Sequence, residues 1–333
     1  MSVATAAAPA SRGRADGLLA GLQRNGWTVG LLVFLALLLL FTKLIQPSYG
    51  IPGIQGLAIS VLPLALAAVA QAIVVIAGGI DLSVGPMMAL TSVVSASLMK
   101  GQSEEFAVLV VIGVLLLGLL IGTINGAVVV ATRVPDIVVT LAMSFVWAGC
   151  ALLVLKTPGG GSAVWLKDLI TGSVLSEWIP KAAVVLIVIV GLIWLPLRRS
   201  RLGLSIYAIG SNQLAAFRSG VAVGPTKVAA YAFAGLFSAF GGLSLTASTG
   251  IGSPLASSYT LMSVAAVVLG GVSLAGGRGG VFGPIVGVMI LQLLRTDLTF
   301  LNLNPSYATV ANGLILIGVV MIGTLVQIRR ARA

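Results

Sequence analysis

The sequence contains no histidine and only one cysteine among its 333 residues. Without imidazole side chains it cannot form a histidine general base, a histidine metal ligand or a Ser-His-Asp triad. The lone Cys150 lies between Gly149 and Ala151 in an apolar stretch, so the chain cannot assemble an internal disulfide or a thiolate metal site. These absences exclude several forms of catalysis, and we expect this chain to bind no metal and no cofactor.

Charged residues are also scarce in this chain. It has 19 Lys and Arg and 8 Asp and Glu, or 8% charged residues, against 58% hydrophobic residues. Soluble domains carry about 25% charged residues, so this composition indicates a protein of the lipid bilayer. The formal net charge of +11 is not a nucleic-acid signature, because long apolar segments separate the basic positions. We therefore expect membrane lipid as a partner and no nucleic acid.

Ten apolar runs predict membrane-spanning helices. They cover residues 27–45, 54–77, 84–99, 107–132, 135–156, 181–197, 227–248, 258–275, 280–295 and 307–327. Residues 54–99 cannot form one helix, because 46 residues at about 1.5 Å each would reach roughly 69 Å across a hydrocarbon core of about 30 Å. The tetrad Gly78-Gly79-Ile80-Asp81 supplies the break. The predicted fold class is an all-α polytopic membrane protein with about ten transmembrane helices, some of them interrupted.

The distribution of charge predicts the orientation of these helices. With the N-terminus inside, thirteen of the 19 Lys and Arg fall on the cytoplasmic side, in agreement with the positive-inside rule. Both termini are then cytoplasmic. We expect a disordered N-terminal tail over 1–26, a transmembrane domain over 27–327 and a basic cytoplasmic tail over 328–333. The first apolar run is too long for the core of a secretory signal.

The glycine-rich break occurs twice in the sequence. Val75–Gly85 matches Val267–Gly277 at Val, Gly-Gly, Leu and Gly, at an offset of 192 residues. Paired interrupted helices in two halves of a transport protein indicate a repeat whose interface lines the solute path. Convergent turn chemistry between helices, with glycine supplying tight conformations, explains the match equally well.

Asp81 is the unexpected residue at the first break, because a carboxylate inside a membrane span is costly. Asp81 or Ser83 can cap a helix that begins near Val84, or Asp81 can contact the solute. Asn125 and Phe145 fit contacts between helices as well as contacts with a solute. The candidate translocation-path residues are Gly78, Gly79, Asp81, Ser83, Asn125, Phe145, Gly270, Gly271 and Ser273.

The loop over 198–226 carries a short predicted helix at about 211–221. Ser211 or Asn212 can cap its start, Gly220 can end it, and Leu214 with Phe217 continues an apolar stripe. An exposed helix of this length is marginal alone, so we expect it to dock on another molecule. A helix that lies on the membrane surface is the alternative.

Three motifs resemble the membrane subunits of bacterial ABC importers of the ribose, xylose and arabinose type. They are Ala77-Gly-Gly-Ile-Asp-Leu-Ser-Val-Gly85, Gly210-x-Asn-x-x-Ala-Ala-x-x-Ser-Gly220 and Ala265-Ala-Val-Val-Leu-Gly-Gly-Val-Ser-Leu-Ala-Gly-Gly277. The resemblance covers about residues 50–325. It implies a permease subunit paired with a second permease copy, a cytoplasmic ATPase that holds ATP and Mg, and an extracytoplasmic solute-binding protein.

The same resemblance implies a role for the loop helix. In this family such a helix fits a groove on the ATPase and transmits its closure. The coupling residues implied are Asn212, Leu214, Ala215, Ala216, Phe217, Arg218, Ser219 and Gly220. Two positions depart from the family pattern: Leu204 stands where relatives often have Arg, and Asp136 stands where an apolar or aromatic residue is commoner. We expect Asp136 to cap the span that begins near residue 135.

These features favour a multi-pass protein of the bacterial inner membrane that imports a neutral polar solute, with ATP hydrolysed by another subunit. A monosaccharide is the expected solute, and a polyol or nucleoside also fits. The rival hypothesis is an ion-coupled secondary transporter or channel with Asp81 as the coupling carboxylate. A membrane-embedded enzyme is disfavoured, because the chain lacks His, a reactive Cys setting and a clustered acidic pair.

Overall fold

The computed structural model describes residues 26–256 and 258–303, together with residues 306, 307, 310, 313, 314, 317, 318 and 321. The predicted tails at 1–26 and 328–333 and most of the tenth predicted span, 307–327, lie outside these residues. The described elements are α2 (Gly26–Ile45), α3 (Ile51–Ile76), α4 (Val84–Met99), α5 (Glu104–Thr132), α6 (Asp136–Val154), α7 (Val164–Ile170), β1 (Ser173–Val174), β2 (Ser176–Pro180), α8 (Lys181–Arg199), α9 (Arg201–Ser211), α10 (Gln213–Arg218), α11 (Val223–Thr249), α12 (Ser258–Leu269) and α13 (Phe282–Phe300).

The fold is helical apart from the small antiparallel hairpin of β1 and β2. Within the described residues, seven helices are long and apolar enough to cross a membrane: α2, α3, α5, α6, α8, α11 and α13. The apolar helices α4 and α12 are shorter, with 16 and 12 residues. At about 1.5 Å per residue they reach roughly 24 and 18 Å, less than a hydrocarbon core of about 30 Å. As helices, both are therefore shorter than the full spans that the apolar runs predict.

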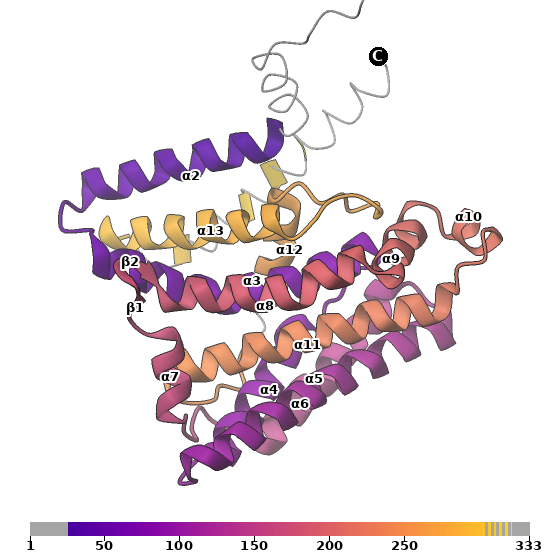
Figure 1. Ribbon diagram of the computed structural model, residues 1–333, viewed down its shortest axis with the longest axis horizontal. Coiled ribbons are helices and arrows are strands. Elements are labelled where there is room, and N and C mark those ends of the chain that lie inside the picture. Colours follow the sequence, from indigo (N-terminus) through magenta and orange to yellow (C-terminus); the bar gives the residue numbers. More distant parts are fainter. Residues whose placement is uncertain are drawn as a thin grey trace, which may run out of the picture.

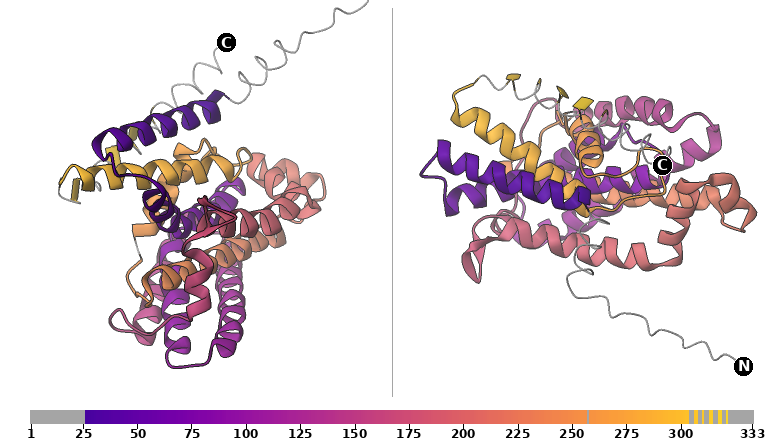
Figure 2. Two further views of the ribbon diagram at one scale, coloured as in Figure 1. Left: turned by 60° about the vertical axis from the view of Figure 1, so that its left-hand side comes forward. Right: turned by 90° about the horizontal axis from the view of Figure 1, so that it is seen from above.

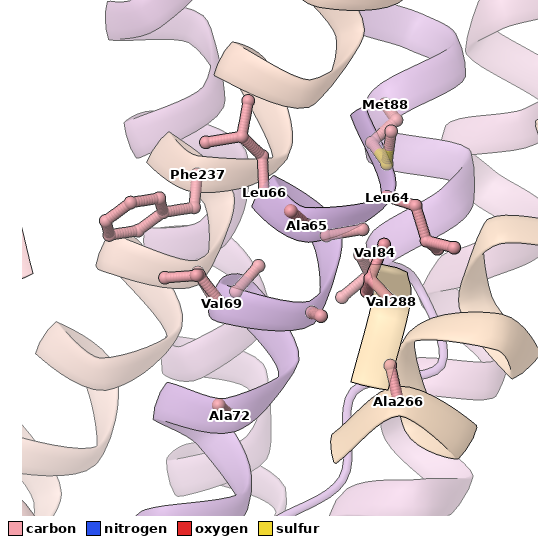
Figure 3. Close-up of a cluster of buried hydrophobic side chains, with 14 of the residues drawn as sticks. Leu64, Ala65, Leu66, Val69, Ala72, Val84, Met88, Phe237, Ala266 and Val288 are labelled. Carbon is pink, nitrogen blue, oxygen red and sulfur yellow. The ribbon is translucent and has the colours of Figure 1, made fainter. Parts of the chain in front are cut away.

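The core of the molecule is built around α3. From Leu62 to Ile76 every residue of this helix is buried. Figure 3 shows Leu66 and Val69 of α3 facing Phe237 of α11, with Val84 of α4 close by. In a bilayer such packing is stabilised by van der Waals contact and not by exclusion from lipid, which is itself apolar.

Small residues bring α5 and α11 into close contact. A Cβ atom on Gly118 would lie 2.6 Å from the backbone oxygen of Gly235, and one on Gly122 would meet the backbone of α11 at both Tyr231 and Gly235. Only glycine permits this approach of the two backbones. The α5–α11 contact therefore forms a rigid unit of the bundle.

The helices at the periphery carry exposed apolar side chains. Both panels of Figure 2 show α2 (indigo) beside α13 (yellow) at the edge of the bundle. Leu37 and Leu44 of α2, Leu116 of α5 and Leu192 of α8 are all more than half exposed. Such a surface suits lipid or another apolar membrane helix.

The two ends of the bundle differ in what they carry. Figure 1 shows α9 and α10 at one end of the long helices and α7 with the β1–β2 hairpin at the other. We call the first the α10 end and the second the α7 end. The loop over 198–226, which the sequence marks as a docking element, thus projects from one end only.

Candidate functional site

The first glycine break ends α3 with a left-handed residue. Gly78 has φ of 87°, and its N–H donates to the Val75 oxygen at 2.9 Å, while the Gly79 N–H donates to the Val74 oxygen at 3.0 Å. This pair of bonds is a Schellman motif, in which glycine at C′ tolerates the positive φ. The predicted break is confirmed at Gly78 and Gly79.

The second break ends α12 in the same way. Gly271 has φ of 77°, its N–H donates to the Val268 oxygen at 3.0 Å, and the Val272 N–H donates to the Val267 oxygen at 3.2 Å. The residue that corresponds to Gly78 is therefore Gly271, whereas the sequence offset of 192 pairs Gly78 with Gly270. The two breaks are therefore related by an offset of 193 residues, because Gly78 and Gly271 are the residues that take the left-handed conformation at the end of each helix.

The two breaks meet each other and α9 at the α10 end. The Gly277 N–H donates to the Ile76 oxygen at 2.9 Å, which joins the second break to the end of α3. Gly210 of α9 lies so close that a Cβ atom there would collide with the Ile76 oxygen and lie 2.6 Å from the Gly277 nitrogen. A Cβ on Gly276 would lie 2.9 Å from the Gly78 Cα. We call this contact between Ile76–Gly78, Gly210 and Gly276–Gly277 the glycine junction.

A tyrosine on α9 adds a second link to the same loop. The Tyr207 hydroxyl donates to the Gly279 oxygen at 2.8 Å. Burial raises the pKa of Tyr207 above its ordinary value, and the nearby Arg198 opposes this shift, so the hydroxyl keeps its proton at neutral pH. The α9 helix therefore contacts the 270–281 segment through both backbone and side chain.

The segment after the first break folds back into the bundle. The side-chain amide of Gln71 pairs with the backbone of Asp81, donating to its oxygen at 2.8 Å and accepting from its N–H at 3.2 Å. Gln71 lies more than one turn before the end of α3, so the chain doubles back along that helix before α4 begins. This return explains why α4 is short, since its N-terminus lies inside the protein.

The buried Asp81 carboxylate holds the turn before α4. Asp81 Oδ1 accepts from the Ser83 N–H at 2.8 Å and from the Ser83 hydroxyl at 2.6 Å. Ser83 Oγ accepts from the Asn125 amide at 2.7 Å, and Asn125 Oδ1 accepts from the Trp147 indole at 2.9 Å. Asn125 thus bonds to neighbouring elements, one of the two roles that the sequence left open.

The predicted capping of α4 by Asp81 or Ser83 is wrong. Neither side chain accepts from the first turn of the helix; instead, the Gly85 N–H donates to Thr260 Oγ1 of α12 at 3.0 Å. The N-termini of the two short helices therefore lie side by side in the interior. The free N–H groups of a helix start need an acceptor, and a residue distant in sequence supplies it.

The predicted capping of α6 by Asp136 is also wrong. Asp136 makes no capping bond, and its carboxylate instead accepts from Lys227 Nζ at 2.8 Å and from the Tyr231 hydroxyl at 3.0 Å, both on α11. A Cβ atom on Gly79 would collide with the Asp136 carboxylate. The first break, the start of α6 and the start of α11 thus form one polar cluster at the α10 end.

The other candidate path residues lie apart from this cluster. Phe145 is 72% exposed on the outer surface of α6. A Cβ atom on Gly270 would meet the backbone of Gly283 and Pro284 at the start of α13, and the Ser273 N–H donates to the Arg278 oxygen at 3.2 Å. Within the described residues, no three acidic or cysteine side chains gather into a group that could hold a metal ion.

The loop over 198–226 contains two helices where the sequence predicted one. The predicted helix is present as α10: Asn212 caps it by accepting from the Ala215 N–H at 2.9 Å, and Gly220 with φ of 82° follows its end. The preceding α9 was not predicted. Leu214 and Phe217 of α10 are 59% and 66% exposed, so the two largest apolar side chains of α10 face away from the part of the chain that the structure describes.

A polar pocket near the α7 end was not predicted. It has a volume of about 500 Å³ and is lined from α3, α11, α12 and α13 by Gly56, Ile59, Ser60, Pro63, Leu245, Ser248, Thr249, Tyr259, Gln292, Arg295, Thr296 and Thr299. The sequence signal that could have found it is the polar series Gln292, Arg295, Thr296 and Thr299, which lies on one face of a helix by its spacing of three and four residues.

Comparisons with known proteins place the chain among transport subunits. Residues 53–325 match the family described as branched-chain amino acid transport system, permease component. The ribose import permease protein RbsC of Haemophilus influenzae is 34% identical over 263 residues, which cover 77% of this chain and 80% of the relative. RbsC of Bacillus subtilis is 33% identical over 90% of this chain and 92% of its own. The D-allose transport system permease protein AlsC of Escherichia coli is 29% identical over 76% and 77%. No solved structure matches the chain.

Proposed function

Because the chain belongs to the family of branched-chain amino acid transport system permease components, we propose that it is the membrane-spanning permease subunit of an ATP-driven ABC importer for a monosaccharide. It is a transport subunit of the bacterial inner membrane and not an enzyme, and a separate subunit hydrolyses ATP. The observation that carries this proposal is the similarity to ribose, allose and galactose permeases over about three quarters or more of both chains.

A sugar suits this chain better than the amino acid in the family's description. The relatives named as ribose, allose and galactose permeases are 29–34% identical to this chain. A zwitterionic solute ordinarily calls for charged partners inside the membrane, and the seven candidate spans contain few charged residues. A polyol or a nucleoside remains the alternative for the same framework.

The partners of such a permease are a cytoplasmic ATPase and an extracytoplasmic solute-binding protein. We place the ATPase at the α10 end, where Leu214 and Phe217 project away from the described residues. The proposed coupling element is α10 with its two flanking turns, and its other residues are Asn212, Ala215, Ala216, Arg218, Ser219 and Gly220. The α10 end is then cytoplasmic, and both termini lie on that side if ten helices enter the membrane. A second permease copy completes the transporter.

The glycine junction supports a route for coupling. The α9 helix is continuous in sequence with α10 and contacts both glycine breaks through Gly210. In this proposal a displacement of α10 by the ATPase is transmitted through Gly210 to the end of α3 and to Gly276–Gly277 in the segment after α12. Small residues at the junction leave no side chains to absorb that displacement, because close-packed backbones move together.

The rival hypothesis assigns the coupling to an ion that binds Asp81. Asp81 is fully buried, and its Oδ1 is occupied by Ser83. Its Oδ2 has no hydrogen-bond partner among the described residues. The Oδ1 bonds support a role in holding the turn before α4, and the two hypotheses differ in what Asp81→Asn does to transport.

The test is transport by the assembled importer in proteoliposomes. The permease is reconstituted with the ATPase and binding protein that co-purify with it, and uptake of radiolabelled ribose, allose, galactose, a polyol and a nucleoside is measured with ATP on the ATPase side. We expect uptake of at least one monosaccharide that requires ATP hydrolysis. An ATPase variant that lacks its catalytic base is the matched control. Uptake at full rate without nucleotide, abolished by Asp81→Asn, would establish the rival.

A further inference from the structure

The polar pocket near the α7 end has the position of an entry site. It lies between the N-terminal half of α3, the end of α11, the start of α12 and the C-terminal half of α13. The α3 helix runs from this pocket to the glycine junction, so the two sites occupy opposite ends of the same helix. If the α10 end faces the cytoplasm, the pocket belongs to the outer half of the permease.

The hydroxyl groups around the pocket present acceptors rather than donors. The Ser60 hydroxyl donates to the Leu57 oxygen at 2.9 Å, and the Ser248 hydroxyl donates to the Leu245 oxygen at 3.0 Å. The hydroxyls of Thr249, Thr296 and Thr299 donate in the same way to carbonyl oxygens four residues earlier on their own helices. For Ser60, Ser248, Thr296 and Thr299 the hydroxyl proton is thereby used within the helix, and the oxygen lone pairs remain available to a ligand that carries O–H groups. Thr249 Oγ1 also lies 2.7 Å from the Ile251 oxygen and accepts from the Ile251 N–H at 3.4 Å.

Two other side chains in the pocket supply unshared donors. The backbone oxygen of Arg295 accepts from the Thr299 hydroxyl, but its guanidinium group makes no hydrogen bond or ion pair with any residue that the structure describes, and neither does the hydroxyl of Tyr259. Gln292 donates its amide to the Ser60 backbone oxygen at 2.7 Å, which leaves its carbonyl oxygen free. The guanidinium group provides up to five N–H donors in one plane.

No acidic side chain in the pocket neutralises the positive charge of Arg295. None of its lining residues is acidic. The nearest acid in sequence, Asp297, is buried and accepts from Thr42 of α2 at 2.7 Å, on another face of α13. A cationic solute is therefore repelled, and a simple anion without O–H groups would leave the acceptor oxygens unsatisfied.

Building on the proposed function, we propose that this pocket is a binding site for a neutral polyhydroxylated solute, a monosaccharide with adjacent hydroxyl groups, on its way into the permease. Each sugar hydroxyl is both a donor and an acceptor, which matches a lining of acceptor oxygens with Arg295 and Tyr259 as donors. The planar guanidinium spans two adjacent hydroxyl oxygens, and the Tyr259 ring offers an apolar face to the sugar C–H groups. The volume of about 500 Å³ falls in the range of pockets for small molecules, about 300–1,000 Å³.

The first test compares sugar uptake by pocket variants in the assembled importer. Arg295→Met removes the guanidinium and keeps a long side chain, and Tyr259→Phe removes only the hydroxyl. We expect Arg295→Met to raise the KM for the imported sugar about tenfold or more, and Tyr259→Phe about threefold. Lys100→Met is the matched control, because Lys100 is an exposed cation near the α7 end outside the pocket, and we expect its KM to stay unchanged.

The second test is independent of transport kinetics. Because Cys150 is the only cysteine, a Cys150→Ala background permits a single reporter thiol in the pocket at Thr299→Cys and one outside it at Lys100→Cys. We expect the imported sugar to slow modification of the pocket thiol by a charged, water-soluble thiosulfonate reagent and to leave the outside thiol unaffected. Equal modification rates with and without sugar at both thiols, together with an unchanged KM in Arg295→Met, would overturn the assignment.

These outcomes separate the inference from the proposed function. If the unmodified importer takes up a sugar with ATP while the pocket variants behave as the control does, the function stands and the pocket assignment fails. If the unmodified importer takes up no sugar at all, the proposed function itself fails.

Discussion

At the scale of single residues, several polar groups inside this protein find their partners in distant parts of the chain. Thr260 accepts from the start of α4, and Thr140 accepts from the Leu82 N–H at 3.1 Å. Asp136 pairs with Lys227 at 2.8 Å, with side chains 13% and 17% exposed. A pair this enclosed is poorly solvated, so each member depends on the other.

Loss of the lysine is therefore expected to destabilise the protein more than loss of the whole pair. Lys227→Met leaves the Asp136 carboxylate enclosed with only Tyr231 as a donor, and removal of one partner of a buried pair costs about 3 kcal/mol. The double variant Asp136→Asn, Lys227→Met removes both charges. We expect the melting temperature of the detergent-purified protein to fall by several degrees in the single variant and by less in the double variant. Equal losses in the two would contradict this dependence.

The residues predicted correctly from sequence are those whose role depends on near neighbours. Asn212 caps α10, Gly220 follows its end, and Gly78 ends α3, because capping and left-handed glycine involve a few consecutive residues. Asp81 and Asp136 carry the same local signal, yet neither caps a helix: Asp81 binds Ser83 in the turn before α4, and Asp136 pairs with Lys227 of α11. Nothing in the nearby sequence indicates that Thr260 or Lys227 would approach, since those contacts arise only when the bundle forms.

At the scale of elements, α10 stands out because its apolar residues project from the bundle. Leu214 and Phe217 lie one turn apart on the same face of α10 and are 59% and 66% exposed, so together they form a small apolar surface. The neighbouring Ala216 is buried and fixes the helix to the rest of the loop. The element therefore presents a rigid apolar contact to a partner.

Replacement of these two side chains is expected to weaken ATPase binding without unfolding the permease. The double variant Leu214→Ser, Phe217→Ser loses the apolar anchors, and loss of such anchors commonly weakens binding about tenfold or more. The amount of ATPase that co-purifies with the permease measures the effect. Leu204→Arg on α9 is the control, because Leu204 is similarly exposed at 66%. The importer family that the chain resembles is expected to tolerate Arg at this position. Undiminished co-purification of the double variant would exclude α10 as the docking element.

The hydropathy of the sequence located the helices along the chain, but it did not show that some of them begin inside the bundle and not at its surface. Each apolar run up to residue 295 coincides with a helix, and the run at 84–99 has the bounds of α4. That α4 starts inside the bundle follows from the contact between Gln71 and Asp81, which no hydropathy window contains. The polar pocket was missed for a related reason, since its lining comes from four helices that are separate in sequence.

At the scale of the whole molecule, the proposed coupling loop, the segments at the two helix breaks and the pocket are connected in series by the contacts of α9 and by α3. The α9 helix contacts both breaks at Gly210, and α3 connects this junction to the pocket at its other end. The bond between the Gly277 N–H and the Ile76 oxygen joins the two halves of the chain. A change that separates these backbones should therefore interrupt transport even though it lies far from any solute.

Gly210→Ala is the substitution that tests this series. Its methyl group would press into the space between the Ile76 oxygen and the Gly277 nitrogen, and overpacking of this kind costs about 1–3 kcal/mol, so the importer should assemble with α9 displaced. We expect the amount of sugar imported per ATP hydrolysed to fall about tenfold or more, measured as both rates in the same proteoliposomes. Gly191→Ala is the matched control, because a Cβ atom there meets nothing within 4 Å.

A milder variant separates coupling from folding. Tyr207→Phe adds no volume and removes only the hydroxyl bond from α9 to the Gly279 oxygen. If α9 acts on the second break, this variant also lowers the sugar imported per ATP, by a smaller factor than Gly210→Ala, while its melting temperature stays close to that of the unmodified protein. A normal ratio in both variants would mean that the ATPase acts on the helix breaks by a path that avoids α9, and the glycine junction would then be a packing feature alone.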